Sequence, residues 1–517
     1  MKPAKIVKVT ALPLLLVSSA TGAVGASGTN GAGHGVAQGA ARPNVLYIMT
    51  DQQSFYMISA ITKSLGPNHP YGNNEYFHTP NLDRLVAGGY TFSNCYASHP
   101  VSGPSRYSLL TGESPNSVGM YGNFSPGGAN GEKVLQIATT RAMGTLFKKA
   151  GYQTYYGGKV HLPWAAGRSG KNSINDAPVK YGFDQYLTED DRAELAQKGV
   201  EFLSGGYKGK EPFLLFLSFM NPHDICMVQM LFNDKTLEDF PPDVWRERRN
   251  QILYRGIYRS LDSTLFDGDQ LARLPFNQAK PDRFPVKKFG QVFKLDDYRT
   301  RVQRWFYYRL TEEVDGHIGQ VLDALERSPY KNNTIIVFTS DHGEMAGSHG
   351  LTGKNVPFEE CQKIPLIFVG KGVQKGVIDN TTPVCNGWDM LPTLLDLAGI
   401  KIPAELNGLS LLGTITAGKP VDRKYLYQET VRSYGVLESG RFKYTRFLPD
   451  KSCGIVETDN EALFDLQKDP GELHNLVYDK SQAAKLNELR AALAVEMQRY
   501  GTTFKPFESA GLFDSEQ

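Results

Sequence analysis

The chain has 517 residues and a net charge of +2, and its hydrophobic and charged fractions (41% and 21%) are those of a globular protein. The length exceeds one typical domain, so we expect a large core with a smaller unit attached. The small net charge gives no basis for binding nucleic acid or a charged membrane surface. The five cysteines are scattered without a CxxC spacing, so they form no zinc or redox motif.

The N-terminus has the pattern of an export signal. A basic start (Lys2, Lys5, Lys8) precedes an apolar run over 12–17 and a small-residue cleavage site at 24–26. The apolar run is too short to span a bilayer, and no later segment is long and apolar enough. We therefore predict export to a bacterial periplasm without stable membrane insertion, with a signal peptide over 1–26 and a flexible Gly/Ala/Ser-rich lead-in over 27–41.

From residue 42 onward, short apolar runs alternate with amphipathic stretches, which is the pattern of an α/β sheet. This pattern predicts strands over 45–50, 213–219, 334–339 and 364–369, and helices over 79–85, 298–327 and 390–398. After about residue 412 the predicted strands become shorter and richer in aromatic residues, over 425–429, 434–438 and 442–447, before a polar helix over 481–500. We predict an α/β catalytic domain over 42–412 and a smaller C-terminal α+β subdomain over 413–517 that carries an antiparallel sheet.

Polar residues follow the predicted strands at the points where each one ends. These residues are Asp51, Lys159, His161, His223, Asp341 and His342. Taken singly, each also fits a capping or structural role. Ligands of open α/β sheets bind beyond the carboxyl ends of the strands, so we expect these side chains to meet at one rim. Six other histidines lack this placement and are assigned surface or core positions, and they are His69, His78, His99, His317, His349 and His474.

The segment 100–112, Pro-Val-Ser-Gly-Pro-Ser-Arg-Tyr-Ser-Leu-Leu-Thr-Gly, combines a hydroxyl, a proline and an arginine in one helical turn. Pro104 fits the first turn of a helix, so Ser102 would lie at the positive end of that helix. An anion bound at that helix end would also lie within reach of the guanidinium of Arg106, which is one turn further along. The pattern indicates attack on phosphate or sulfate, and the alternative is a plain N-cap beside a solvated arginine.

This segment resembles the nucleophile signature of type I sulfatases, in which a Cys or Ser is oxidised after translation to formylglycine. The segment 151–161 resembles the second signature of that family, with Gly157 in place of a slightly larger residue. The resemblance runs from Pro43 to the segments 463–466 and 469–472. It implies an alkaline-phosphatase-like fold, in which helices sandwich a large mixed central sheet.

The strand-end residues also form a plausible site for a hard cation, because they offer carboxylate, amide and imidazole donors. The predicted ligands are Asp51, Gln52, Asp341 and His342, with a further oxygen from Ser102. The resemblance implies Ca²⁺, and Mg²⁺ or Mn²⁺ fit less well. Gln52 stands where a second aspartate is usual in the family, which removes one negative charge.

A sulfate monoester is a stable anion, so its catalyst must neutralise developing charge and supply a strong nucleophile. We expect the metal, Arg106, Lys159 and Lys354 to clamp the sulfate oxygens. The resemblance implies that formylglycine at position 102 is the nucleophile, held and polarised by Arg106 and Lys159. It also implies that His161 is the base that releases sulfate, and we expect His223, with Lys354, to protonate the leaving alcohol.

These features and the resemblance together predict hydrolysis of sulfate esters on a sulfated sugar, such as a glycosaminoglycan, mucin or algal glycan. A Ser-type signature implies an anaerobic sulfatase-maturing enzyme as partner. Two alternatives stay open at this point. One is a phosphate or phosphonate monoester hydrolase of the same superfamily that uses unmodified Ser102, and the other is an unmatured protein that only binds sulfated glycans.

Overall fold

A large mixed β-sheet forms the centre of the chain. The computed structural model describes residues 42–67, 69–72, 74–123, 126, 128–163, 173–226, 279, 281–286, 297–450, 454–456 and 458–503. In this part the sheet has the strand order β4-β3-β5-β1-β6-β7-β2-β8, and β9 pairs with β2. The strands are β1 (Asn44–Asp51), β2 (Tyr90–Tyr96), β3 (Gln153–Gly158), β4 (Gln185–Tyr186), β5 (Phe213–Pro222), β6 (Thr334–Ser340), β7 (Lys363–Val369), β8 (Val377–Asp379) and β9 (Val384–Cys385).

Parallel pairing prevails in the half of the sheet that carries the polar strand ends. Strand β1 is parallel to both β5 and β6, and β3 is parallel to β5. Strand β7 is antiparallel to β6 and to β2, which makes the sheet mixed. The predicted large mixed sheet is therefore confirmed.

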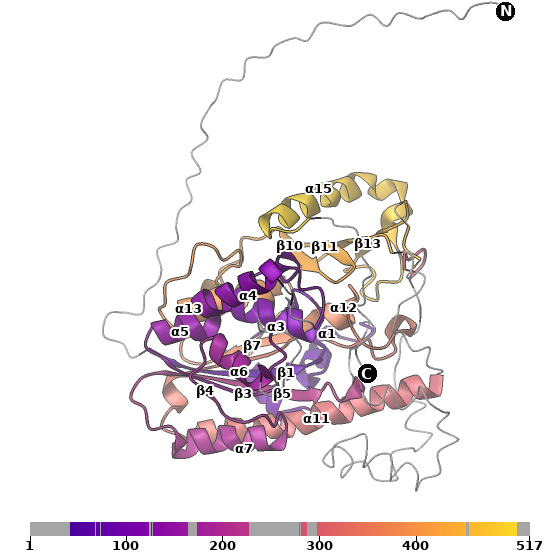
Figure 1. The fold of residues 1–517 in the computed structure, drawn as a ribbon. Helices are drawn as coiled ribbons and strands as arrows, with labels where there is room; N and C mark the ends of the chain where they lie inside the picture. The colour runs from indigo at the N-terminus through magenta and orange to yellow at the C-terminus, as the bar shows by residue number, and fades with distance from the viewer. Residues whose placement is uncertain are drawn as a thin grey trace, which may run out of the picture. The chain divides into compact units, whose positions relative to one another are not determined.

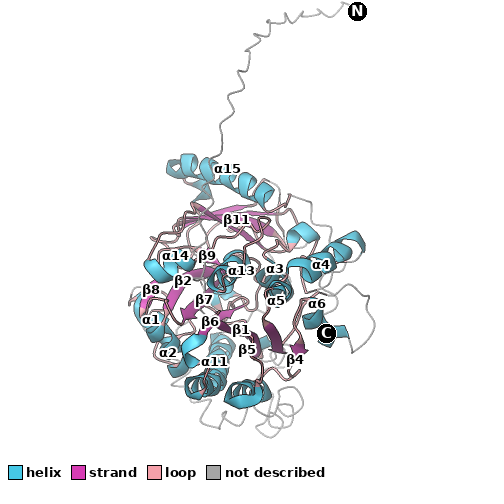
Figure 2. Cartoon of the chain, turned by 90° about the vertical axis from the view of Figure 1, so that its left-hand side faces the viewer, coloured by secondary structure: helices cyan, strands magenta, loops and turns pink. Residues whose placement is uncertain are grey.

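Helices cover both faces of this sheet (Figures 1 and 2). Successive residues of β1 point to opposite faces, so Leu46 and Ile48 pack in one core while Val45, Tyr47 and Met49 pack in the other. The first core includes residues of α1 (Ser59–Leu65), α2 (Pro80–Gly88), α7 (Ala193–Glu201) and α11 (Asp297–Arg327). The second includes residues of α3 (Ser102–Thr111), α4 (Gly128–Arg141), α5 (Met143–Lys149), α6 (Ser173–Lys180), α13 (Asn386–Leu397) and α14 (Leu412–Ala417).

A second, antiparallel sheet lies toward the C-terminus, in the order β10-β11-β12-β13. Its strands are β10 (Tyr425–Glu429), β11 (Ser433–Glu438), β12 (Phe442–Phe447) and β13 (Glu461–Asp465), and α15 (Ala483–Arg499) packs on it (Figure 1). Trp388 of α13 shares a buried cluster with this sheet. The antiparallel C-terminal sheet is therefore confirmed, while the boundary between domains at residue 412 stays a prediction. All described residues belong to one compact unit, Gly35–Gln517.

The predicted elements match the observed ones closely, with differences at their ends. Helix α13 begins at Asn386, four residues before the predicted start, and the N–H of the preceding residue, Cys385, donates to the Asp389 carboxylate at 2.8 Å. Strand β5 continues to Pro222, three residues beyond the predicted end. The predicted signal peptide and lead-in, residues 1–41, lie outside the described residues.

The unusual Gly157 in the second signature has a packing reason. A Cβ at this position would lie 2.7 Å from Cδ1 of Leu195 on α7, so a larger residue would require the Leu195 side chain to shift. The small residue therefore allows close packing of α7 on β3.

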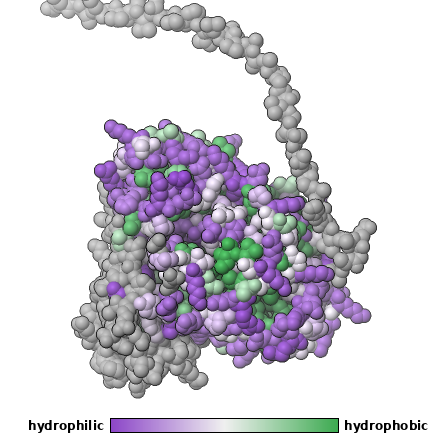
Figure 3. Space-filling view, turned by 180° about the vertical axis from the view of Figure 1, so that it is seen from behind, coloured by the Kyte–Doolittle hydropathy of each residue, from purple (hydrophilic) through white to green (hydrophobic). Residues whose placement is uncertain are grey.

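No helix in the described ranges is long and apolar enough to cross a membrane. The face seen from behind is largely hydrophilic, with one hydrophobic area near its centre (Figure 3).

Candidate active site

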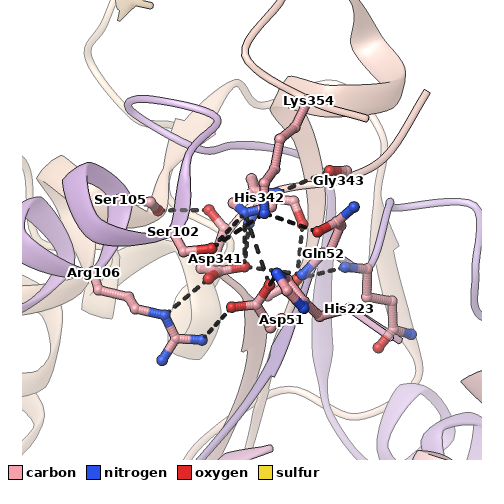
Figure 4. A network of polar contacts seen from close by, with 12 residues as sticks. Asp51, Gln52, Ser102, Ser105, Arg106, His223, Asp341, His342, Gly343 and Lys354 are labelled. Carbon is pink, nitrogen blue, oxygen red and sulfur yellow. Dashed lines mark hydrogen bonds and ion pairs between the residues drawn. The ribbon is translucent and has the colours of Figure 1, made fainter. Parts of the chain in front are cut away.

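Four neighbouring strands bring the predicted residues to one edge of the central sheet. In β1 and β6, Thr50 pairs with Ser340, so Asp51 and Asp341 follow at the same level. On the other side of β1, Asp51 pairs with Pro222 of β5, which places His223 beside it. Strand β3 ends next to β5, and Lys159 follows it. The parallel order therefore explains why these strand ends meet (Figure 4).

Helix α3 supplies the hydroxyl. Ser102 is its first residue, is fully buried, and has its Oγ 3.0 Å from Nε2 of His342. The other ring nitrogen of His342, Nδ1, lies 2.9 Å from the carbonyl oxygen of Gly343 and therefore carries the proton. Nε2 is then an acceptor, and the Ser102 hydroxyl donates to it. Lys354 reaches Ser102 Oγ from a separate segment, at 3.5 Å (Figure 4).

Arg106 holds the two carboxylates together. Its Nη2 donates to Asp51 Oδ2 at 2.8 Å and its Nε to Asp341 Oδ2 at 2.9 Å. Its Nη1 donates to the Lys159 carbonyl at 3.0 Å and to Ser218 Oγ at 2.7 Å. The side chain is almost completely buried, and each of its nitrogens donates to a protein acceptor. These contacts of Arg106 are all with protein groups and do not test its predicted contact with the sulfate oxygens, which stays a prediction.

Opposite charges lie in contact at this edge of the sheet. Lys159 Nζ lies 2.6 Å from Asp51 Oδ2. Burial raises the pKa of Asp51, but the positive charges of Lys159, Arg106 and Lys354 outweigh it and hold the pKa of this carboxyl well below its usual range. Burial and the neighbouring Asp51 raise the pKa of Asp341 in spite of Arg106. Asp51 is therefore the more firmly ionised carboxylate of the pair.

The histidines of the site are neutral. Burial, together with Lys159 and Arg106, lowers the pKa of His161 to about 3. Burial, with Lys159 and Lys354, holds the pKa of His223 well below its usual range. His223 Nε2 lies 4.0 Å from Asp51 Oδ1. Neutral imidazoles in a cationic pocket can accept a proton, and they act as acids only after a nearby anion has raised their pKa and they have taken up that proton.

The donor set at the carboxylates fits a divalent cation. Ligand atoms of Asp51, Asp341 and His342 all lie within 4.8 Å of one another. Asp51 Oδ1 is buried and accepts no hydrogen bond from any described residue, which is the state expected of an oxygen reserved for a metal. Gln52 is less clearly a ligand, because its Oε1 accepts from Lys354 Nζ at 2.9 Å.

A second group of donors, His349, Glu360 and Glu472, lies within the same limit. Lys443 Nζ stands 2.5 Å from Glu472 Oε1 and 3.0 Å from Glu359 Oε1, so this cluster already contains its own cation. We assign it to the structural network that joins the two sheets. His349 is buried, in agreement with its expected core position.

Sequence reasoning missed two buried residues at the site. Ser218 bonds Arg106, and it is the one hydroxyl in the apolar run 213–219, which was an available signal. Glu344, three residues after Asp341, accepts a hydrogen bond from the Gln52 side-chain amide. A single sequence gives no sign of that contact.

Comparison with known proteins shows the family to which the chain belongs. The chain matches the family model described as Sulfatase over residues 43–400, and the model described as N-sulphoglucosamine sulphohydrolase, C-terminal, over 347–499. It is a hydrolase of sulfuric esters. The chain belongs to the sulfatase family, as its two signatures indicated.

Two relatives come from Bacteroides thetaiotaomicron. The Delta 4,5-hexuronate-2-O-sulfatase is 28% identical over 484 residues, which cover 88% of this chain and 89% of that protein. The N-acetylglucosamine-6-O-sulfatase is 27% identical over 516 residues, which cover 89% and 87%.

Solved structures share the fold. One, described as a complex with its substrate D-glucosamine-2-N,6-O-disulfate, has a TM-score of 0.66 and 24% identity, and covers 89% of this chain and 98% of that chain. The phosphonate monoester hydrolase from Silicibacter pomeroyi has a TM-score of 0.64 and 21% identity, with 89% and 96% covered. At these identities the likeness concerns the fold alone.

Proposed function

We propose that the protein removes sulfate from a sulfated carbohydrate, with Ser102 converted to formylglycine and Ca²⁺ bound beside it. The observation that carries this proposal is the position of Ser102 Oγ, buried at the start of α3, 3.0 Å from His342 and 3.5 Å from Lys354. The same edge holds Asp51 and Asp341, whose ligand atoms cluster with that of His342. The residue proposed as the nucleophile, the proposed ligands of the cation and Lys354 therefore lie close together, which supports the proposal.

An unmodified serine is a poor candidate for complete turnover. Attack by its hydroxyl would leave a serine sulfate ester, which is as hard to hydrolyse as the substrate. A hydrated aldehyde at position 102 supplies one hydroxyl to attack sulfur and a second through which sulfate leaves as the carbonyl re-forms. Oxidation of Ser102 would thus solve the problem of the second step.

The neighbouring side chains supply the proton transfers. His161 is neutral, since its pKa is about 3, and is therefore able to accept the proton whose loss releases sulfate. His223, with Lys354, would protonate the leaving alcohol. The negative charge of a bound sulfate ester raises the pKa of His223 and counteracts the influence of Lys159 and Lys354 that now lowers it.

Arg106 and Lys159 stabilise the carboxylates of the site in this scheme. Arg106 neutralises and orients both carboxylates, and Lys159 neutralises Asp51.

The residues that would hold Ca²⁺ are Asp51, Asp341 and His342, joined by Gln52 and by an oxygen of residue 102. The ion would supply positive charge to the sulfate oxygens. Its predicted ligands are oxygen-rich, which favours Ca²⁺ over softer metals.

A sulfated sugar is the substrate class that the relatives support. Their names specify sulfate on a hexuronate and on N-acetylglucosamine. The basic and apolar start of the chain supports export, and the serine at position 102 supports modification by an anaerobic sulfatase-maturing enzyme.

The test is to produce the protein with and without such a maturing enzyme. Mass spectrometry of the peptide containing residue 102 should show the loss of two hydrogens only in the first sample. That sample should release sulfate from defined sulfated mono- and disaccharides, and the unmodified one should not. Equal activity of both samples on phosphate or phosphonate esters would instead support the phosphoesterase, and binding without turnover by the modified sample would support a glycan receptor.

A further inference from the structure

We infer that Glu344 is a positioning residue, which fixes the Gln52 amide and thereby holds the Lys354 ammonium at residue 102. The inference rests on the proposed function, because it concerns the geometry around the nucleophile. Glu344 is fully buried, three residues beyond Asp341. Its carboxylate bonds the Gln52 amide and the loop before Lys354, so its effect would be exerted through these neighbours.

The Glu344 carboxylate joins two segments that are far apart in the sequence. Its Oε1 accepts hydrogen bonds from the backbone N–H groups of Gly353 at 2.6 Å and Ala346 at 3.1 Å. Its Oε2 accepts from Nε2 of Gln52, the residue after β1. The Glu344 carboxylate therefore restrains both the loop that leads to Lys354 and the Gln52 side chain, which bonds the Lys354 ammonium.

This contact decides which way the Gln52 amide faces. Nε2 donates to a carboxylate, and a flipped amide would set its oxygen against Glu344 Oε2. Oε1 must therefore point the other way, where it accepts from Lys354 Nζ at 2.9 Å. Nζ lies 3.5 Å from Ser102 Oγ, so the series Glu344, Gln52, Lys354 ends at the nucleophile.

Both ends of the Lys354 side chain are thus restrained by the same carboxylate. Its backbone follows Gly353, whose N–H is bonded to Glu344, and its ammonium is bonded to the amide that Glu344 orients. Lysine has four rotatable side-chain bonds, and such restraint keeps its charge at one place before substrate arrives. Loss of Glu344 should therefore impair the reaction more than it impairs binding.

A double-mutant cycle tests this with the matured enzyme, using Glu344→Gln, Lys354→Ala and the pair. Glu344→Gln should lower kcat on a sulfate ester about 10–100-fold, which is the range for partners that orient active-site groups, with little change in KM. In the Lys354→Ala background the same change should lower kcat by less than about twofold, because the group that it positions is gone. Equal losses of kcat in both backgrounds would overturn the inference.

A control and a second variant separate positioning from folding. Glu461→Gln removes a carboxylate that bonds Arg490 and Tyr444 in the C-terminal sheet, and it should leave kcat unchanged. If Glu344→Gln does not fold, Glu344→Asp retains the charge but shortens the reach to Gln52, and a wild-type kcat in that variant would overturn the inference. A matured wild-type protein that turns over no sulfate ester would instead overturn the proposed function itself, and the inference with it.

Discussion

Replacing Arg106 by lysine tests whether this side chain serves mainly to hold two carboxylates together. The guanidinium donates to Asp51 at 2.8 Å and to Asp341 at 2.9 Å, and also to Ser218 and the Lys159 carbonyl. A lysine ammonium keeps the positive charge but is a single point with three donors. It cannot bond both carboxylates and both remaining acceptors at once.

The size of the effect follows from this count of contacts. Arg106 bonds four acceptors and an ammonium has three donors, so at least one hydrogen bond is lost at a site where Arg106 is only 1% exposed. A hydrogen bond to a charged group contributes about 1.5–3 kcal/mol, so Arg106→Lys should reduce the free energy of unfolding by at least about 1.5–3 kcal/mol. The loss rises to about 3–5 kcal/mol where the ammonium also leaves one of the buried carboxylates without its ion pair.

Denaturant-induced unfolding, followed by circular dichroism in calcium-free buffer, would measure the change. Arg84→Lys is the matched control, because Arg84 forms one ion pair with Asp323 and both side chains are about half exposed. Such surface pairs contribute about 0–1 kcal/mol. If Arg106→Lys were no more destabilising than Arg84→Lys, the account of Arg106 as the link between the carboxylates would be wrong.

Three further predictions concern the nucleophile, the metal and acid stability. Ser102→Ala should abolish sulfate release while circular dichroism shows an unchanged fold, and retained turnover would contradict the assignment of the nucleophile. Chelation by EDTA should lower both Tm and activity, and Ca²⁺ should restore them, because a bound ion would offset the repulsion between Asp51 and Asp341 that remains in spite of Arg106; identical Tm values with and without Ca²⁺ would argue against the site. Burial raises the pKa of Glu360, but His349 and several hydrogen bonds lower it from 4.5 to about 2. This folded-state pKa is depressed, so the Glu360 carboxylate stabilises the fold above about pH 4.5 and loses that effect as the pH falls toward 2. Glu360→Gln should then flatten the acid limb of a stability–pH curve, and an unaltered limb would refute this.

The sequence predicted the edge of the sheet well because strand ends are a local feature. Asp51, His223 and Asp341 each follow an apolar run, and parallel strands β5, β1 and β6 do bring them together. The helix start at Ser102 was equally readable from Pro104. These features depend on neighbouring residues and on a general rule of α/β sheets, so a single sequence contains them.

The contacts between distant segments could not be predicted in the same way. Arg106 was expected to reach toward a substrate anion, whereas the structure has it bonded to Asp51 and Asp341, 55 and 235 positions away. The contact of Glu344 with Gln52 spans 292 positions. Such pairs depend on the tertiary path of the chain, and nothing in local spacing specifies which acceptor a long side chain will meet.

The complete burial of Ser102 limits when the residue can be modified. It has no exposed surface once α3 is packed and His342 lies against it. His342 comes from a strand end 240 positions later in the chain. An enzyme that oxidises the Ser102 side chain must therefore act while the newly made polypeptide is still open, so competition between modification and folding would set the fraction of active molecules.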